Sequence, residues 1–538
     1  MAITAVLVLL SAKFTWPDGD DGRYAVWAIA LAQGDGITNI HLPEPTPEVV
    51  VPPGLSMALA PVVLLLGPDN FTAMMLFSAV CLILLCPVVL RWLQQEACPP
   101  GLWTISACVM GVWGVFTISA AWRIHTEVLY MLLSFSALAF WPDRKDQAWK
   151  ILVPGLLAGA AFMTRTVGLA LLPAGMVALL FQRRWTQAVL FALAFTAVNL
   201  PLALRSVALA GTPVGYTQSS GIHNLADQLK TVSVFIPHYL FYGLPDLMFY
   251  RLISPDGLFS KLHLPCLATP AAILIGVLVA IGFFSRVFRF GVTDLYWGAY
   301  FLIISSFNQP DYAARGEYLF QDRYVIPVIP IAALYISRAL SLLSNQGAAT
   351  FGKRIGQSVI VSLAFYVAAT ATGAAISRFR SEAVFRGLHP MAPARYADLP
   401  NPNDRAWGSY FDCAFWLGSN APPGAVVVCR KPYEVFLAST LASTRYIELG
   451  TGERLLNRIS QWQNPGVYIL EDAFTAETAF GRERNAIVKP LLEDYAENFE
   501  LLYETGEPTA RVWKLRQVGV NPKRDSDDEQ DDDGAWRQ

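Results

Sequence analysis

Long apolar runs, separated by short charged connections, fill the chain from its first residues to about Ile376 and then stop. A helix needs about 20 apolar residues to cross the hydrocarbon core of a bilayer, and several of these runs are shorter. We predict membrane spans near residues 1–14, 71–91, 101–120, 126–141, 151–164, 166–181, 187–204, 266–285, 293–307, 324–342 and 356–376. The pattern therefore predicts a polytopic α-helical membrane domain over residues 1–376, with about 11 spans and a first outer loop over residues 13–70.

Two apolar stretches differ clearly from the length of a single membrane span. The apolar stretch Ile151–Phe181 is too long for one crossing and has Arg165 in its middle, where a charge is costly. We expect two short helices that meet at Arg165 on the aqueous side. The opening run Met1–Ala12 is long enough for only about 18 Å of helix. Because it lacks the basic start of a signal peptide, we expect a short or extended anchor helix.

Lysine and arginine are concentrated in alternate connections, and the positive-inside rule assigns those connections to the cytoplasm. The basic residues of this set are Arg91, Arg144, Lys145, Lys150, Arg183, Arg184, Arg286, Arg289, Arg338, Lys353 and Arg354. The first outer loop, the surroundings of Arg165, the segment before Arg323 and everything after Ser377 then lie on the opposite side. We therefore expect a protein of the bacterial inner (plasma) membrane whose C-terminal part is extracytoplasmic.

A different composition begins after the last predicted span. Residues 377–406 are basic and Pro-rich, and we predict a linker there. Residues 407–517 predict an extracytoplasmic α/β domain, because short β-type runs alternate with helix-like segments. Those runs are Ala425–Cys429, Thr444–Ile447, Val467–Leu470, Phe499–Tyr503 and Arg511–Leu515. The acidic residues 518–538 predict a disordered tail.

The composition agrees with a membrane protein. Of 538 residues, 54% are hydrophobic and 15% charged, against about a quarter charged in soluble domains, and the mean hydropathy is +0.39. These figures exclude a soluble enzyme, a disordered scaffold and a disulfide-rich secreted domain. The net charge of −2 becomes +5 without the seven acidic residues of Asp525–Asp533, so nothing indicates nucleic-acid binding. Whether Cys413 and Cys429 form a disulfide is left open.

The densest polar cluster of the membrane part lies in the first outer loop. Asp18, Asp20 and Asp21 closely follow the opening anchor, which places three carboxylates at the membrane surface. Behind them, Tyr24 and Trp27 begin the apolar face of a predicted helix. Aspartate commonly caps the start of a helix, and that interpretation stays open. Three carboxylates in four residues nevertheless exceed what a cap needs, and they indicate a functional site.

Three motifs, in order along the chain, resemble those of lipid-linked-sugar glycosyltransferases. The first is D-D-x-x-Y, at Asp20, Asp21 and Tyr24, with P-P-G-L further along the same loop. The second is a G-x-x-x-G-x-x-x-x-T-R helix that ends at Arg165, and the third is R-Y-x-x-P-x-x-P, which begins at Arg323. Together they resemble the GT-C superfamily, which includes bacterial relatives of protein O-mannosyltransferases and the aminoarabinose transferases that act on lipid A.

One position departs from the aminoarabinose transferases. Those enzymes carry a lysine just before the proline pair of the first loop, and this chain has Val49-Val50-Val51 there. The resemblance therefore implies a broader activity, that of an inverting hexosyl- or pentosyltransferase. Such an enzyme moves a sugar from a polyprenyl-phosphate donor to an acceptor on the extracytoplasmic face. The sugar and the acceptor, whether lipid, glycan or protein, are left open.

The resemblance also assigns roles to residues. Transfer needs a carboxylate that takes the proton of the acceptor, and Asp20 matches that position, with Asp21 second. It also needs a cation that stabilises the departing phosphate. Arg165 and Arg323 are the candidates, because both lie at outward-facing ends of predicted spans. The alternative for these two arginines is that they are interface anchors extending to water.

Glu127 and His125 start a span on the outer side, where similar transferases often carry an acidic residue. With Tyr24 and His41 of the first loop, they are candidates for contact with the acceptor or with a divalent cation. No other cofactor is implied. The alternative for Glu127 is a charge that complements the helix dipole, and the spacing of these residues does not identify a metal.

Two other classes of function remain open on the sequence. A transporter or flippase of lipid-linked substrates usually keeps ionisable residues near the midplane, whereas the acids here gather at one face. A non-catalytic membrane assembly protein would use the α/β domain to bind a partner. Under the glycosyltransferase interpretation, the expected partners are membrane lipids and a polyprenyl-phosphate sugar, and no nucleic acid.

Overall fold

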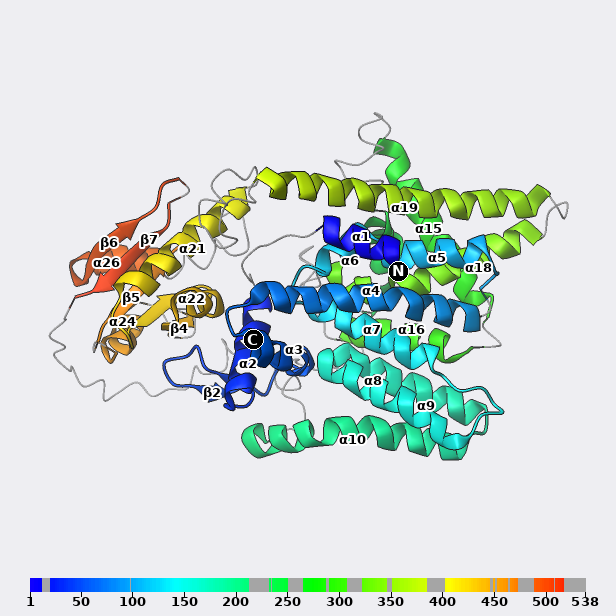
Figure 1. Cartoon of the computed structure of the whole chain (residues 1–538), viewed down its shortest axis with the longest axis horizontal. Helices are drawn as coiled ribbons and strands as arrows, with labels where there is room; N and C mark the ends of the chain where they lie inside the picture. The colour runs from blue at the N-terminus through cyan, green and yellow to red at the C-terminus, as the bar shows by residue number, and fades with distance from the viewer. Residues whose placement is uncertain are drawn as a thin grey trace. The chain divides into compact units, whose positions relative to one another are not determined.

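A computed structural model of the chain divides into two compact units, each built from separate stretches of sequence (Figure 1). The first unit takes in Met1–Lys13, Val49–Leu55 and Thr72–Glu382. The second takes in Phe14–Glu48, Ser56–Phe71 and Ala383–Gln538. The structure describes residues 1–11, 20–96, 98–211, 232–233, 235–249, 265–286, 290–306, 322–345, 351–384, 402–445, 449, 452–462, 465–472, 488–507 and 509–516. Asp18, most of the predicted linker and the predicted tail lie outside these residues.

The first unit is helical. Its helices are α1 (Ala2–Leu10), α4 (Phe71–Gln95), α5 (Leu102–Val112), α6 (Val115–Ala120), α7 (Thr126–Ala139), α8 (Leu152–Thr164), α9 (Leu171–Phe181), α10 (Trp185–Ala210), α13 (Leu244–Met248), α15 (Ala268–Phe284), α16 (Val292–Ser306), α18 (Ile329–Asn345) and α19 (Phe351–Val384). The short turns are η1 (Ala148–Ile151), η2 (Thr166–Ala170), η3 (Tyr239–Gly243), η4 (Pro265–Leu267) and η5 (Asp322–Val328).

Every predicted span coincides with one or two of these helices. Four helical segments are long and apolar enough to cross a membrane: Phe71–Gln95, Trp185–Ala210, Tyr324–Ser344 and Gly352–Ser377. Six shorter apolar helices accompany them among the described residues. The prediction of a polytopic, mostly helical membrane protein is therefore confirmed, while the number of spans stays a prediction. The last long helix, α19, continues to Val384, beyond the point at which the apolar pattern ends.

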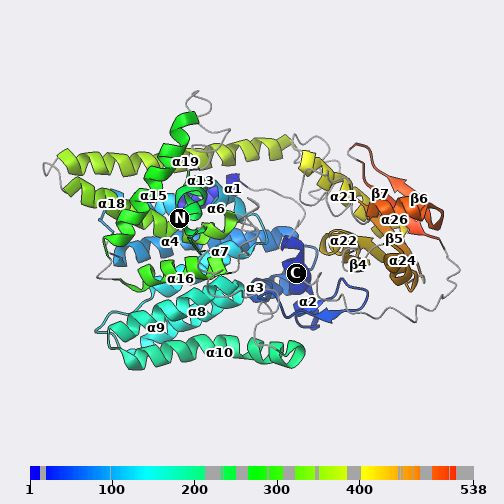
Figure 2. The same ribbon diagram turned by 180° about the vertical axis from the view of Figure 1, so that it is seen from behind.

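The long apolar stretch Ile151–Phe181 breaks where the sequence predicts. Helix α8 ends at Thr164, Arg165 has an extended backbone (φ −147°, ψ 135°), and η2 and α9 follow. Helices α8, α9 and α10 lie side by side in both views (Figures 1 and 2). The glycines of the second motif allow this packing, since a Cβ at Gly155 would lie 2.8 Å from the carbonyl oxygen of Phe191 in α10. The glycines of the motif thus let α8, which ends just before Arg165, pack closely against α10.

The opening helix α1 is short and is held by two tryptophans. The Trp113 indole donates a hydrogen bond to Thr4 Oγ1 (3.1 Å), and the Trp122 indole donates to the Val8 carbonyl (2.6 Å). Both tryptophans flank α6, at the turns that precede and follow that helix. The apolar run at the start of the chain therefore packs within the first unit as a short helix, as predicted.

The second unit combines the first outer loop with a five-stranded sheet. Its elements are α2 (Asp20–Gln33), β1 (Thr38–Asn39), β2 (Thr46–Pro47), most of α3 (Gly54–Leu66), α21 (Pro402–Asn420), β3 (Val426–Cys429), α22 (Pro432–Ser439), β4 (Ala442–Arg445), α24 (Gly452–Ser460), β5 (Val467–Glu471), α26 (Lys489–Asp494), η7 (Ala496–Asn498), β6 (Phe499–Glu504) and β7 (Arg511–Leu515). Each of the five runs that predict a strand overlaps an observed strand.

The sheet has the order β4-β3-β5-β7-β6. Strand β3 is parallel to β4 and β5, whereas β7 is antiparallel to β5 and β6. Every residue of β3 and β5 is buried, which is typical of central strands covered on both faces. On one face, Val428 and Ile469 pack with Leu455 and Ile459 of α24 and with Leu491 of α26. Alternate residues of the strands point to the other face.

The two cysteines of this unit are separate thiols. Cys413 lies in α21 and Cys429 at the end of β3, and both are free and buried. Burial raises the pKa of Cys429 to about 12 and also raises the pKa of Cys413. Both thiols are therefore protonated at neutral pH and act as small apolar side chains.

Candidate active site

Arg165 and Glu127 form a buried ion pair in the first unit. The Nη1 atom of Arg165, at the break between α8 and η2, lies 2.7 Å from Oε1 of Glu127 in the first turn of α7. The two side chains are only 9% and 4% exposed. Arg165 Nη1 also donates to Thr126 Oγ1 at 3.4 Å. Arg165 is therefore not an interface anchor extending to water, because its guanidinium is directed at an acidic partner within the protein.

Segments from three of the sequence motifs meet around Arg165. Gly54 of P-P-G-L abuts the end of α8, where a Cβ would lie 2.6 Å from the Met163 carbonyl oxygen and 2.8 Å from the Thr164 nitrogen. Tyr324 of R-Y-x-x-P-x-x-P presents its ring 4.9 Å from the guanidinium carbon of Arg165, a cation–π contact. Residues far apart in the sequence thus converge on one cation.

His125 completes this cluster. It occupies the N-cap position of α7, and its Nδ1 atom lies 3.7 Å from Oε2 of Glu127. The structure therefore brings together three of the predicted site residues: Arg165, Glu127 and His125. Glu127 also lies in the first turn of a helix, where a negative charge complements the helix dipole. The same carboxylate therefore stabilises α7 and pairs with Arg165.

Buried tyrosines extend the site, and sequence reasoning missed them. The Tyr130 and Tyr296 hydroxyls lie 2.7 Å apart, and the Tyr300 hydroxyl donates to the Tyr324 carbonyl at 2.6 Å. Tyr300 and Tyr324 lie close enough to Arg165 to interact with it electrostatically. The available signal was the spacing, since Tyr130 follows Glu127 by three residues and Tyr296 precedes Tyr300 by four, which places each pair on one helix face.

The aspartates of D-D-x-x-Y lie in the second unit. The predicted helix is present as α2, which begins at Asp20, so both aspartates belong to its first turn, and Asp21 is buried (2% exposed). The structure describes the backbone of Asp20 and Arg323 and not their side chains. Tyr24 packs edge-on against Trp27 (5.9 Å), and its carbonyl accepts a hydrogen bond from Ser56 in α3 (2.9 Å). This contact ties α2 to α3.

His41, a candidate for contact with the acceptor or a cation, belongs to the second unit. Its ring packs on Tyr433 with centroids 4.1 Å apart, and its carbonyl accepts a hydrogen bond from the Ser443 amide (2.6 Å). Burial, followed by the positive charges of Arg23 and Arg445, lowers the pKa of His41 to about 3. His41 is therefore neutral at neutral pH. Among the described residues, no three His, Cys, Asp or Glu side chains form a group that could hold a metal ion.

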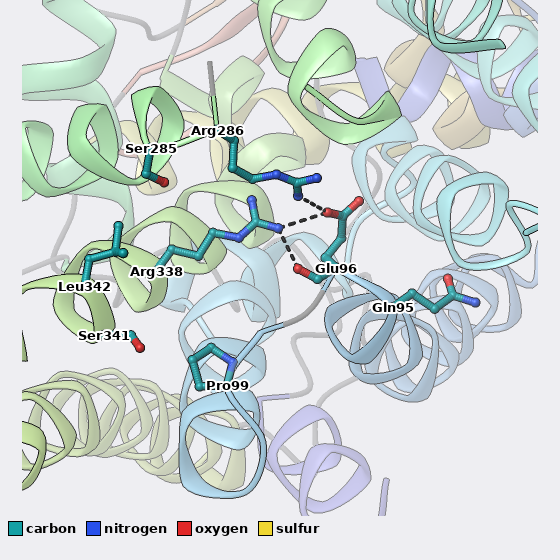
Figure 3. A pocket seen from close by; sticks show the side chains of 8 residues that line it. All are labelled: Gln95, Glu96, Pro99, Ser285, Arg286, Arg338, Ser341 and Leu342. Carbon is teal, nitrogen blue, oxygen red and sulfur yellow. Dashed lines mark hydrogen bonds and ion pairs between the residues drawn. The ribbon is translucent and has the colours of Figure 1, made fainter. Parts of the chain in front are cut away.

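A second charged cluster lines a pocket of about 450 Å³ in the first unit (Figure 3). Arg286 Nη1 and Arg338 Nη2 lie 2.8 and 2.9 Å from Oε2 of Glu96, and Arg338 also donates to the Glu96 carbonyl at 2.7 Å. Asp294, fully buried, lies 3.6 Å from Arg286 and 3.7 Å from Arg338. Two arginines thus face two carboxylates, and the cluster joins α18 to the ends of α4, α15 and α16.

Comparisons with known proteins identify the fold. No family model and no curated protein sequence matches the chain. Among solved structures, ArnT from Cupriavidus metallidurans bound to undecaprenyl phosphate is 13% identical, with a TM-score of 0.55 over 96% of this chain and 97% of that one. The Archaeoglobus fulgidus oligosaccharyltransferase AglB, in complex with an inhibitory peptide and a dolichol-phosphate, is 12% identical, with a TM-score of 0.53 over 97% of this chain and 74% of that one. The chain therefore shares the fold of these two proteins, as its motifs predict.

Proposed function

We propose that this protein is an inverting glycosyltransferase that moves a sugar from a polyprenyl-phosphate donor to an acceptor on the extracytoplasmic face of the membrane. The observation that carries the proposal is the convergence of Gly54, Tyr324 and Glu127 on Arg165, in a chain that has the GT-C fold. ArnT with this fold binds undecaprenyl phosphate, and AglB binds a dolichol-phosphate. The same lipid-phosphate chemistry suits the cationic site of this chain.

Arg165 is the proposed phosphate-binding residue, and Arg323 is the second. A guanidinium has five N–H donors, and Glu127 and Thr126 both use Nη1 of Arg165. The other donors can bind a phosphate oxygen while Glu127 keeps the guanidinium in place. The site lies in a unit of apolar helices, which suits a donor whose polyprenyl tail stays in the bilayer.

Asp20 is the proposed general base, and Asp21 the second carboxylate. The carboxylate takes the proton from an acceptor hydroxyl as its oxygen attacks the anomeric carbon of the donor. The bond between that carbon and the phosphate oxygen breaks, and the polyprenyl phosphate leaves with the electron pair. Because attack and departure occur on opposite sides of the sugar, one displacement inverts the anomeric configuration. The arginines stabilise the negative charge on the departing phosphate.

Glu127, His125 and Tyr24 are proposed to lie on the acceptor side of the reaction. Glu127 lies within an ion pair and next to His125, so it can accept a hydrogen bond from an acceptor hydroxyl without bearing an uncompensated charge. His41 packs on Tyr433 and is not among the proposed acceptor-binding residues.

The proposal is tested with Asp20→Asn in membranes that carry the native acceptor. Labelled polyprenyl-phosphate hexoses and pentoses are added, and the release of polyprenyl phosphate is measured together with sugar transfer. We expect Asp20→Asn to lower the rate by about 10²–10⁴-fold, the usual contribution of a general base. Asp35→Asn is the matched control, because Asp35 follows the same helix, is exposed and undergoes the same loss of charge.

Unimpaired transfer by Asp20→Asn would reject this base. The same vesicles test the alternative of a lipid-linked-substrate transporter: movement of the donor across the bilayer without any transfer would favour transport. An assembly role would be favoured if the wild-type protein turned over no donor and deletion of the C-terminal α/β domain abolished the recruitment of a partner.

A further inference from the structure

The helix that carries the two aspartates packs on α22, the helix that joins two strands of the C-terminal sheet. Helix α2 contacts α22, which connects β3 to β4. Gly22 comes immediately after Asp20 and Asp21, and a Cβ there would lie 3.1 Å from Tyr433 Cβ and 3.4 Å from Glu434 Cδ. Because a larger residue would push the two helices apart, glycine allows this close approach. The start of α2 therefore rests on the C-terminal part of the second unit.

Tyr433 is the centre of this contact. The guanidinium carbon of Arg23 lies 5.4 Å from the centre of its ring, and the His41 ring lies 4.1 Å away. Arg23 belongs to the first turn of α2, and His41 to the loop between β1 and β2. One aromatic side chain thus contacts both the helix of the aspartates and the loop that follows it.

The loop also covers the free edge of the sheet. Strand β4 is an edge strand, and its Ser443 amide donates a 2.6 Å hydrogen bond to the His41 carbonyl. An uncovered edge amide would otherwise be available to another chain. The first outer loop is therefore hydrogen-bonded to the sheet through its backbone and packed on α22 through Tyr433.

The carboxyl edge of the parallel strands is filled by protein groups. In many α/β folds this edge binds a ligand. Here Arg430, just after β3, forms a 2.9 Å ion pair with Asp472, just after β5, and both side chains are 1% exposed. The nearby surface of α22 is covered by α2 and its loop. The segment that α22 and β4 bind is the chain's own first outer loop.

We propose that the C-terminal sheet positions the first outer loop for catalysis, and that Tyr433 is the positioning residue for Asp20 and Asp21. This inference rests on the proposed function of the aspartates. Removing the ring leaves α2 free to shift, and a displacement of about 1 Å in a catalytic group can lower a rate by about 10²-fold. Donor binding is assigned to Arg165 and Arg323, so the donor KM stays unchanged while kcat falls.

The experiment compares Tyr433→Ala, Tyr433→Phe and Tyr503→Ala in the full-length protein in proteoliposomes with native acceptor. Tyr503 stacks on Trp416 (5.2 Å) elsewhere in the same unit, so it controls for the loss of a stacked tyrosine. We expect Tyr433→Ala to lower kcat by about 10²-fold at constant donor KM. Tyr433→Phe keeps both ring contacts, so its kcat should stay near the wild-type value. The kcat of Tyr503→Ala should also stay near the wild-type value.

Hydrogen exchange gives a readout that does not depend on activity. In Tyr433→Ala, the amides of Asp20–Gln33 should exchange faster, while those of Val426–Cys429 and Val467–Glu471 keep their protection. Unchanged exchange in α2 together with full kcat would overturn the inference. If the wild-type protein transfers no sugar, the proposed function fails, and faster exchange in α2 alone would then support the contact without a catalytic purpose.

A second variant covers the case in which Tyr433→Ala fails to fold. Gly22→Leu changes α2 and leaves every residue of the sheet in place, and it forces the same separation from Tyr433. Its matched control is Gly373→Leu in α19, where a Cβ meets no atom within 4 Å. We expect a loss of kcat in the first variant and none in the second. Equal kcat in both would overturn the inference.

Discussion

A buried guanidinium such as that of Arg165 must keep a counter-charge, because leaving it unpaired in an apolar surrounding costs several kcal/mol. Glu127 supplies that charge at 2.7 Å, and Tyr324 and Thr126 add weaker contacts. The pairing of Arg165 with Glu127 was not predictable from the sequence, because Arg165 follows α8 and Glu127 belongs to α7. Each residue was predicted only separately, from its position at the end of a span.

Glu127→Gln keeps the size of the side chain and removes its charge. We expect the protein to lose about 3–5 kcal/mol of stability, the cost of leaving one buried charge unpaired. Thermal unfolding in detergent measures the loss. The double variant Glu127→Gln/Arg165→Gln should recover part of the stability and none of the transfer activity, because phosphate binding is lost with the cation.

Asp146→Asn is the control for this variant, since Asp146 pairs with Lys150 at the surface. An exposed ion pair contributes little to stability, so the unfolding temperature should hardly change. Equal effects of Glu127→Gln and Asp146→Asn would contradict the importance of the buried pair.

At the scale of elements, the site depends on how Gly54 meets the end of α8. Gly54, the first residue of α3, touches the backbone of Met163 and Thr164, one turn or less before Arg165. A helix ordinarily gains about 1 kcal/mol when alanine replaces glycine. The contact with α8 opposes that gain, because backbone atoms cannot move aside as a flexible side chain can.

Gly54→Ala should therefore raise the donor KM and reduce stability, since α8 has to shift and Arg165 moves with it. Overpacking typically costs about 1–3 kcal/mol. Gly373→Ala in α19 is the matched control, because a Cβ there meets nothing within 4 Å. Donor KM and unfolding temperature measure both variants. A Gly54→Ala protein that behaves like the Gly373→Ala protein would argue against a close contact at this site.

Much of the element scale could be predicted from the sequence, for identifiable reasons. Apolar runs mark the helices, and the cost of burying Arg165 at mid-helix marks the break after Thr164. Alternating β-type runs mark the strands. The sequence did not reveal that α2 packs on α22, because local patterns hold no information about contacts between distant segments. Tyr296 and Tyr300 were hidden for a different reason, since tyrosine does not interrupt an apolar run.

At the scale of the molecule, the buried charges that the structure describes in the first unit form two compensated clusters. One surrounds Arg165, and the other surrounds Glu96, which takes both Arg286 and Arg338. The distribution of basic residues predicts only that these two arginines lie in cytoplasmic connections, and local patterns do not predict their acidic partners. Only the cluster at Arg165 includes residues of the motifs, so the two clusters should respond differently to mutation.

Glu96→Gln should lower stability and spare catalysis. It removes the shared acceptor of two arginines, and we expect a loss near the lower end of the buried-pair range, about 3 kcal/mol, because Arg286 is partly exposed. Transfer per folded molecule should match the wild-type value. Thermal unfolding and the donor assay on the same preparation test this, and a loss of donor turnover in folded protein would contradict it.

The second unit also has a consequence for biosynthesis. Its loop and its sheet are separated in the sequence by Thr72–Glu382, the longest stretch of the first unit, so a ribosome produces α2 long before Tyr433. While the apolar helices enter the bilayer, the segment bearing the aspartates has no sheet on which to dock. The proposed catalytic arrangement can therefore form only after the C-terminal strands are made, and a nascent chain or a prematurely terminated product stays inactive toward the lipid donors around it.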